Sequence, residues 1–169
     1  MPVFKLPPTR PLLLQVVCKI MSHETLIKSR KRVKDFAEVY TPNWLVKDMV
    51  ALTDASEPSK TILEPACGNG NFLAEILEQK LAKCNNDDDA WTSLKSLFGI
   101  DIQDDNIREC KDRLCEIFLR KMPDTDTKDI ISILDQNIVC GNFLTKRCWS
   151  QGKELDKIIW FLDDEPRLF

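Results

Sequence analysis

The sequence predicts an α/β fold in which a mostly parallel sheet is flanked by helices. Short apolar segments that suit strands recur along the chain, at 61–63, 97–102, 137–140 and 157–161. Helical patterns separate the first three of them, at 72–81 and at 104–120. Strands that alternate with helices in this way form parallel sheets with right-handed crossovers, because each helix carries the chain back to the same end of the sheet.

Two further helices are predicted ahead of the first strand. One covers residues 24–37, where apolar side chains recur at helical spacing. The other covers residues 42–52, where Thr41 can serve as the N-cap and Pro42 suits the first turn. Two polar segments, 85–89 and 121–136, are expected to form a solvated turn and a loop.

The composition describes one globular domain of 169 residues. The net charge of −3 gives no general basic footprint, so any contact with nucleic acid has to be local. The seven cysteines form no C-x-x-C pair and there is one histidine, which argues against a zinc site and fits a reducing cytosol. No apolar run approaches the ~18 residues that a membrane span needs. We therefore expect a cytoplasmic protein with no metal and no membrane contact.

The first twenty residues differ in character from the rest. A short apolar run there resembles a signal peptide, but four prolines and the lack of a small-residue cleavage site argue against one. A second methionine, Met21, opens a markedly different stretch. We expect residues 1–20 to be a disordered leader, or to result from a translation start assigned too far upstream. Residues 21–169 are expected to form the functional domain.

A glycine loop, LEPACGNG, lies between the first predicted strand and the helix after it. In parallel sheets such a loop lies at the carboxyl edge, where ligands bind. Gly68 and Gly70 allow a ligand to approach the backbone closely, and the helix start offers free N–H groups. The Lys-Ser/Thr of a phosphate-binding loop and the third glycine of the dinucleotide fingerprint are both missing. The loop by itself is compatible with several ligands.

Asp101 ends the next predicted strand. An acidic side chain at that place can accept hydrogen bonds from both hydroxyls of a ribose. The same side chain can instead cap the helix that is expected to begin near Asp104. The glycine loop that precedes it favours the ribose role.

Four segments, in order, resemble motifs of the adenine-specific DNA methyltransferases. EPACGNGNFL (64–73) resembles motif I, and EVYTPNWLVKDMV (38–50) ahead of it resembles motif X. GIDIQ (99–103) is similar to motif II, and IVCGNFL (138–144) is similar to motif III. Motif X ahead of motif I is the order of the gamma class, which includes many restriction–modification methylases. The four segments together are far more specific than any one of them.

The resemblance implies a Rossmann-like class I methyltransferase fold, with S-adenosyl-L-methionine as the cofactor and DNA as the substrate. It implies that Asp101, with Ile102 next to it, holds the ribose. Asn142 and Phe143 would flank the adenine, although the family usually has Asp at the first of these positions and the second could be ordinary core. The residues implied around the methionine part are Glu64, Ala66, Gly68 and Gly70, closed by Tyr40, Thr41 and Pro42.

The catalytic tetrapeptide of that family, N/D-P-P-Y/F at the end of the fourth strand, is missing from the sequence. In the family its polar groups accept hydrogen bonds from the amino group of a flipped-out base, and its aromatic ring stacks on that base. ELDKIIW (154–160) resembles its lead-in, but FLDDEPRLF follows, and the single Pro166 has no aromatic neighbour in the right place. No catalytic residue is therefore assigned. We expect a domain that is incomplete at its C-terminus through a frameshift, a premature stop or a gene-model break.

Two other functions stay open at this point. The chain could be a catalytically inactive cofactor-binding remnant or a partner subunit, with DNA bound only through a recognition domain or a second chain. It could also be a methyltransferase acting on RNA or protein, although the Y-T-P and C-G-N-G-N-F details favour DNA. The basic run KSRKRVK (28–34) could contact DNA phosphates, but a solvated helix face explains it equally well.

Overall fold

The computed structural model describes residues 26–150 and 153–155. The chain divides into two units, Met1–Val39 and Tyr40–Phe169, which are treated separately. The described part of the first unit contains helix α2 (Arg30–Phe36). This helix is shorter than the predicted one, because the Ser29 side chain accepts from the Arg32 N–H and caps it, and Ala37 ends it in the left-handed region. The predicted leader, residues 1–20, lies outside the described residues.

Five strands of the second unit form one sheet, in the order β1-β2-β3-β4-β5. The first three pair in parallel, as predicted, whereas β4 and β5 pair antiparallel and were not predicted. The sheet is thus parallel only in its first three strands, because two reversals of the chain follow β3 directly. The predicted strand at 157–161 lies outside the described residues. The strands are β1 (Ile62–Glu64), β2 (Leu97–Asp101), β3 (Ile138–Asn142), β4 (Arg147–Ser150) and β5 (Lys153–Leu155).

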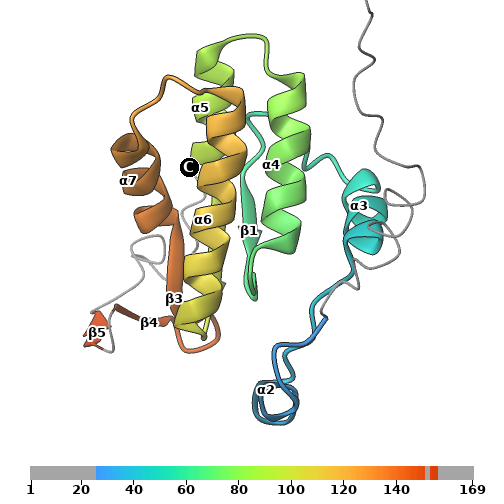
Figure 1. Cartoon of the computed structure of the whole chain (residues 1–169), viewed down its shortest axis with the longest axis vertical. Helices are drawn as coiled ribbons and strands as arrows, with labels where there is room; N and C mark the ends of the chain where they lie inside the picture. Colours follow the sequence, from blue (N-terminus) through green and yellow to red (C-terminus); the bar gives the residue numbers. More distant parts are fainter. Residues whose placement is uncertain (1–25, 151–152, 156–169) are drawn as a thin grey trace, which may run out of the picture. The chain divides into compact units, whose positions relative to one another are not determined.

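Helices connect the parallel strands, which confirms the α/β class. The predicted helices at 72–81 and 104–120 correspond to α4 (Asn71–Lys83) and α6 (Asp104–Lys121), which lie side by side in Figure 1. Helix α3 (Asn43–Ala51) begins one residue later than expected. Its N-cap is Pro42, whose carbonyl accepts from two helix amides, so the prediction that Thr41 caps it is wrong.

Two helices occupy segments that were expected to be a turn and a loop. Helix α5 (Asp87–Lys95) begins within the acidic segment, because the Asn86 side chain accepts from the Asp89 N–H at 2.8 Å and acidic residues favour a helix N-terminus. Helix α7 (Thr127–Asn137) is capped by the side chain of Asp126. The expectation of no regular structure in these two segments is therefore wrong.

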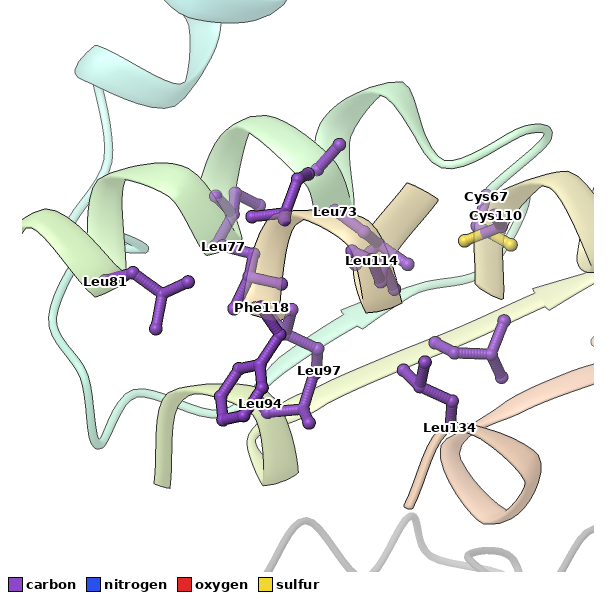
Figure 2. Packing of buried hydrophobic residues seen from close by; sticks show 14 of the residues in the cluster. Cys67, Leu73, Leu77, Leu81, Leu94, Leu97, Cys110, Leu114, Phe118 and Leu134 are labelled. Atoms are coloured by element: carbon purple, nitrogen blue, oxygen red, sulfur yellow. The ribbon is translucent and has the colours of Figure 1, made fainter. Parts of the chain in front are cut away.

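The main hydrophobic core lies between the helices and one face of the sheet (Figure 2). Leu73 and Leu77 of α4 face Leu114 and Phe118 of α6, and all four are fully buried. The ring of Phe118 also packs on Trp91, with centroids 4.9 Å apart. Complete burial of large side chains stabilises the domain by about 1.5–3 kcal/mol for each. This core holds α4 and α6 against the strands whose carboxyl ends form the site.

A charged side chain, Lys80, is buried within this core. Its ammonium donates to the Ser96 hydroxyl at 2.7 Å, to the Pro58 carbonyl at 3.3 Å and to the Lys60 carbonyl. Burial lowers the pKa of Lys80 to about 8. The lysine thereby fastens the loop ahead of β1 to the segment ahead of β2. None of the helices in the described part of the chain has the length and apolar content that a membrane span needs.

Candidate functional site

The glycine loop runs from the end of β1 to the start of α4 and has a left-handed backbone at two places. Gly68 has a φ of 53° and Gly70 a φ of 85°, which side chains rarely adopt. A Cβ atom on Gly70 would lie 2.6 Å from the sulfur of Cys110, and one on Gly68 would lie 3.2 Å from the Tyr40 ring. Both glycines are therefore required by the backbone conformation and by the close approach of a neighbour.

Asp101 joins this loop to the start of α6. Its Oδ2 accepts from the Gly68 N–H at 3.1 Å. Its Oδ1 accepts from the Gln103 N–H at 2.8 Å and from the side-chain amide of Asn106 at 3.2 Å. The carboxylate thus links the glycine loop to the first turn of α6. The N-cap of this helix is Gln103, so the capping role considered for Asp101 is wrong, and its ribose role stays a prediction.

The Tyr40-Thr41-Pro42 segment is tied to the same loop by hydrogen bonds. The Tyr40 hydroxyl donates to Oδ1 of Asn106 at 2.8 Å. The Thr41 carbonyl accepts from the Asn71 side chain at 3.0 Å, just beyond the glycine loop. Residues that are far apart in the sequence, at 40–42 and 68–71, thereby form one cluster.

Three residues of this cluster were missed by the sequence analysis. Asn71 and Asn106 provide the hydrogen bonds just described, and Arg113 donates to Oδ1 of Asn71 at 2.6 Å and to the Asn69 carbonyl at 3.3 Å. The signal for Asn106 was its spacing. It lies four residues before Cys110 on the apolar stripe of α6, where a buried polar side chain needs a partner.

Glu64, Ala66 and Ile102 lie around the edges of the loop. Glu64 ends β1 and is half-buried, and burial raises the pKa of its carboxyl although the Ala66 N–H opposes the rise. Ala66 is exposed, and so is Ile102, which follows β2. The half-buried carboxyl is the feature here with chemical consequences, because it can respond to a cationic ligand.

Cys67 lies beneath the loop and is buried, with its sulfur next to that of Cys110 (Figure 2). The hydrogen bond with Cys110, together with burial, raises the pKa of the Cys67 thiol well above its ordinary value. A thiol in this state is a poor nucleophile at neutral pH. Cys67 thus has the environment of a packing residue.

Asn142 and Phe143 lie at the end of β3 and take part in other contacts. The Asn142 Oδ1 accepts from the Thr145 N–H at 3.0 Å within the turn that leads to β4. Phe143 packs against a second apolar cluster made by Phe98, Ile100 and Cys148. In the described part of the chain, no hydrogen bond joins Asn142 to the glycine loop or to Asp101. The structure therefore brings the 40–42 segment, the loop and Asp101 together. Asn142 lies two residues beyond Cys140, which pairs with Asp101, so β3 ends at the same edge of the sheet, and the roles expected for Asn142 and Phe143 stay predictions.

Metal ligands do not gather near the loop. In the described residues there is no group of three or more His, Cys, Asp or Glu side chains that could hold a metal ion. The polar groups that converge are instead backbone N–H groups, one carboxylate, one tyrosine and two asparagines. Such a set suits an organic ligand with hydroxyl and amino groups.

Comparison with known proteins identifies the family. A family model described as N-6 DNA Methylase matches residues 22–159, which is most of the chain. The chain belongs to the N-6 DNA methylase family. No curated protein and no solved structure matches it. The resemblance of the four motif-like segments to adenine-specific DNA methyltransferases is confirmed at the level of the family.

The N-6 DNA methylase family has methyl transfer to DNA as its activity, and its cofactor is implied to be S-adenosylmethionine. Two features of this member fit such a cofactor. The left-handed backbone at Gly68 lets the loop turn beneath the Tyr40 ring, which packs where a side chain would otherwise lie. The Asp101 carboxylate at the carboxyl end of β2 is where an α/β fold receives a ribose. The residues that surround the loop are therefore suited to the cofactor of the family.

Proposed function

We propose that residues 21–169 form a Rossmann-like class I methyltransferase domain that binds S-adenosyl-L-methionine at the glycine loop. The domain supplies the cofactor-binding part of an adenine-specific N6 DNA methyltransferase of the restriction–modification type. One observation carries this proposal: Gly68 lies between the Tyr40 ring, 3.2 Å from its Cβ position, and the Asp101 carboxylate, 3.1 Å from its N–H. Three separate segments thus meet at one residue whose backbone a ligand can approach.

The proposed roles follow from the groups that each residue offers. Asp101 accepts from the ribose, and the loop backbone at Gly68 and Gly70 lies along the methionine part of the cofactor. Glu64 faces the α-ammonium group of the methionine part, where Tyr40 closes the site. When bound, S-adenosyl-L-methionine supplies a methyl group on a positively charged sulfur. The residues of this chain hold and orient it, and they shield one side of it from water.

The target adenine of DNA is not assigned to any residue of this chain, because the sequence given contains no N/D-P-P-Y/F tetrapeptide. Binding and polarising the flipped base needs such groups. DNA is therefore bound together with a recognition domain or a partner subunit. A second candidate function, proposed beside the first, is a cofactor-binding subunit that acts with a chain carrying the base-binding tetrapeptide, and copurification with such a chain would favour it. The cytoplasm, where both DNA and the cofactor are available, is the proposed location.

Calorimetric titration with S-adenosylhomocysteine, the stable product form of the cofactor, tests the binding. We expect wild-type protein to bind and Gly68→Ala to lose at least about tenfold in affinity, because a left-handed alanine is strained by roughly 1–2 kcal/mol and its Cβ crowds Tyr40. Ser132→Ala, at an exposed position of α7, is the matched control and should bind normally. A wild-type protein that binds no cofactor would overturn the proposal, as would equal affinity of the Gly68 variant.

Transfer of a labelled methyl group distinguishes the two candidate functions. Transfer to unmethylated DNA by the chain alone favours the enzyme, and transfer only with a second chain that carries the tetrapeptide favours the subunit. Label on RNA or protein but not on DNA would contradict the DNA assignment. The assay is independent of the titration, since a chain can bind cofactor and transfer nothing.

A further inference from the structure

Asn106 is a buried polar residue whose two side-chain atoms both contact the candidate site. It is 1% exposed and lies in the first turn of α6. Its Oδ1 accepts from the Tyr40 hydroxyl at 2.8 Å, and its Nδ2 donates to Oδ1 of Asp101 at 3.2 Å. Buried amides are retained with their partners satisfied, because an unpaired one costs about 1–3 kcal/mol. This one links the tyrosine and the aspartate that flank Gly68.

The orientation of this amide follows from chemistry. An ionised carboxylate can only accept, so Asn106 must present its NH₂ group to Asp101. Its carbonyl oxygen then faces Tyr40, whose hydroxyl must donate. The direction of both hydrogen bonds is thereby fixed, and neither partner can exchange roles.

The acceptor positions of Asp101 are nearly filled by the protein itself. A carboxylate offers about four lone-pair positions, two on each oxygen. Both positions on Oδ1 are taken, by the Gln103 N–H and by Asn106. Oδ2 accepts from Gly68 and has one position left. Without Asn106, one position on each oxygen would be available, which is what a pair of ribose hydroxyls needs.

We propose that Asn106 is a positioning residue that makes Asp101 a single-hydroxyl acceptor. By occupying Oδ1, it leaves only Oδ2 for the ligand, so Asp101 bonds one ribose hydroxyl and not both. By holding Tyr40 at the same time, it fixes the ring beside Gly68 relative to that oxygen. The inference rests on the proposed function and refines the expectation that Asp101 accepts from both hydroxyls.

The test compares S-adenosylhomocysteine with its 2′-deoxy and 3′-deoxy derivatives by calorimetry. In wild-type protein we expect one derivative to bind about tenfold more weakly than the parent and the other within about threefold, because a hydrogen bond to a charged group contributes about 1.5–3 kcal/mol. Equal losses for both derivatives, or no loss for either, would overturn the inference without any variant. If the parent compound does not bind at all, the proposed function fails and the inference fails with it.

Two variants show whether Asn106 is responsible. Asn106→Leu keeps the volume but frees Oδ1, so the ratio between the two derivatives should fall to within about threefold as the carboxylate turns towards both hydroxyls. A merely structural role would weaken all three compounds alike and leave the ratio unchanged, which counts against the proposal.

The leucine variant leaves the Tyr40 hydroxyl without its acceptor and could fail to fold, so a second variant is needed. Asn106→Asp retains an oxygen for Tyr40 and places a second carboxyl beside Asp101, and two buried carboxyls at this distance share a proton. We expect the difference between the two derivatives to persist while the introduced carboxyl holds this proton and donates it to Asp101, and to disappear at the higher pH where the proton is released. Thermal unfolding verifies the fold of both variants. Asn85→Asp, the same change at an exposed asparagine ahead of α5, is the control and should keep the wild-type ratio at every pH, and a changed ratio there would contradict the assignment to Asn106.

Discussion

Single residues at the site could be recognised from the sequence when their backbone or charge is unusual. Gly68, Gly70 and Asp101 were found because glycines before a helix and an acid after a strand are rare in combination. The spacing of Asn106 on the apolar stripe of α6 indicates that it is buried, but its partner Tyr40, 66 residues away, is encoded by no local pattern. Local sequence thus indicates which residues are strained or charged, but not which distant side chains form hydrogen bonds with them.

The half-buried carboxyl of Glu64 leads to a pH-dependent prediction. Burial raises its pKa above the ordinary 4.5, and a cationic ligand favours the ionised form. Ligand binding therefore releases a proton near that raised pKa, so the affinity for S-adenosyl-L-methionine should increase as the pH rises through it. Because one proton is released, the affinity can change by at most about tenfold per pH unit.

Titration calorimetry between mildly acidic and neutral pH measures this slope. Glu64→Gln should flatten it, whereas Glu116→Gln, at an exposed carboxyl on α6, should not. An unchanged slope in the Glu64 variant would show that another group is responsible.

At the scale of elements, apolar periodicity predicted the long helices and the buried strands. The two helices that were not predicted, α5 and α7, begin at side-chain caps. Helices α4 and α6 were found because each carries a continuous apolar stripe. Helix α5 was taken for a turn, since its start is a run of Asn and Asp with few apolar residues after it. Helix α7 carries a readable signal, with Ile130 and Leu134 buried four residues apart after a capping Asp126. Strands β4 and β5 are short, and β4 follows a turn that lacks a strong hairpin sequence.

The start of α5 is stabilised by reciprocal hydrogen bonds that can be tested. The Asn86 side chain accepts from the Asp89 N–H at 2.8 Å, and the Asp89 carboxylate accepts from the Asn85 N–H at 3.0 Å. Asn86→Ala should lower the free energy of unfolding by about 1 kcal/mol, measured by urea denaturation. Asn85→Ala retains the backbone N–H and serves as the control, with a loss of less than about 0.5 kcal/mol. Equal losses in the two variants would argue against a specific cap.

At the scale of the whole molecule, the described residues form one sheet with two apolar faces of different kinds. The larger core cluster contains the residues of the helices, and the smaller one joins only strand residues and Phe143. In a parallel sheet, the helices that connect the strands lie against its faces. The predicted crossover helices therefore account for the larger cluster. The antiparallel strands after β3 were not anticipated, because both are short and neither carries an apolar run, and the further strand predicted at 157–161 lies outside the described residues.

Lys80 makes the free energy of unfolding of the domain vary with pH in the alkaline range. Its pKa is lowered from 10.5 to about 8 in the folded chain, so between these values the unfolded chain binds more protons. The free energy of unfolding therefore rises across this window, relative to a variant without the group, and the contribution is lost as the pH falls through about 8. The gain is on the order of 2–3 kcal/mol for this fully buried side chain.

Denaturant unfolding of wild type and Lys80→Met under reducing conditions, from pH 7 to 10.5, measures this dependence. We expect the difference in unfolding free energy between the two proteins to change in favour of wild type as the pH rises. Lys95→Met, at an exposed lysine, should run parallel to wild type. Parallel curves for the Lys80 variant would contradict the lowered pKa.

The hydrogen bond between Tyr40 and Asn106 has a consequence for the order of folding. It closes a loop of 66 residues, and such distant contacts form only after the chain has paid a large entropic cost of closure. We therefore expect the cluster around Gly68 to form after the local helices. A ligand that binds there recognises the folded chain alone, so by mass action it would also protect the domain against unfolding.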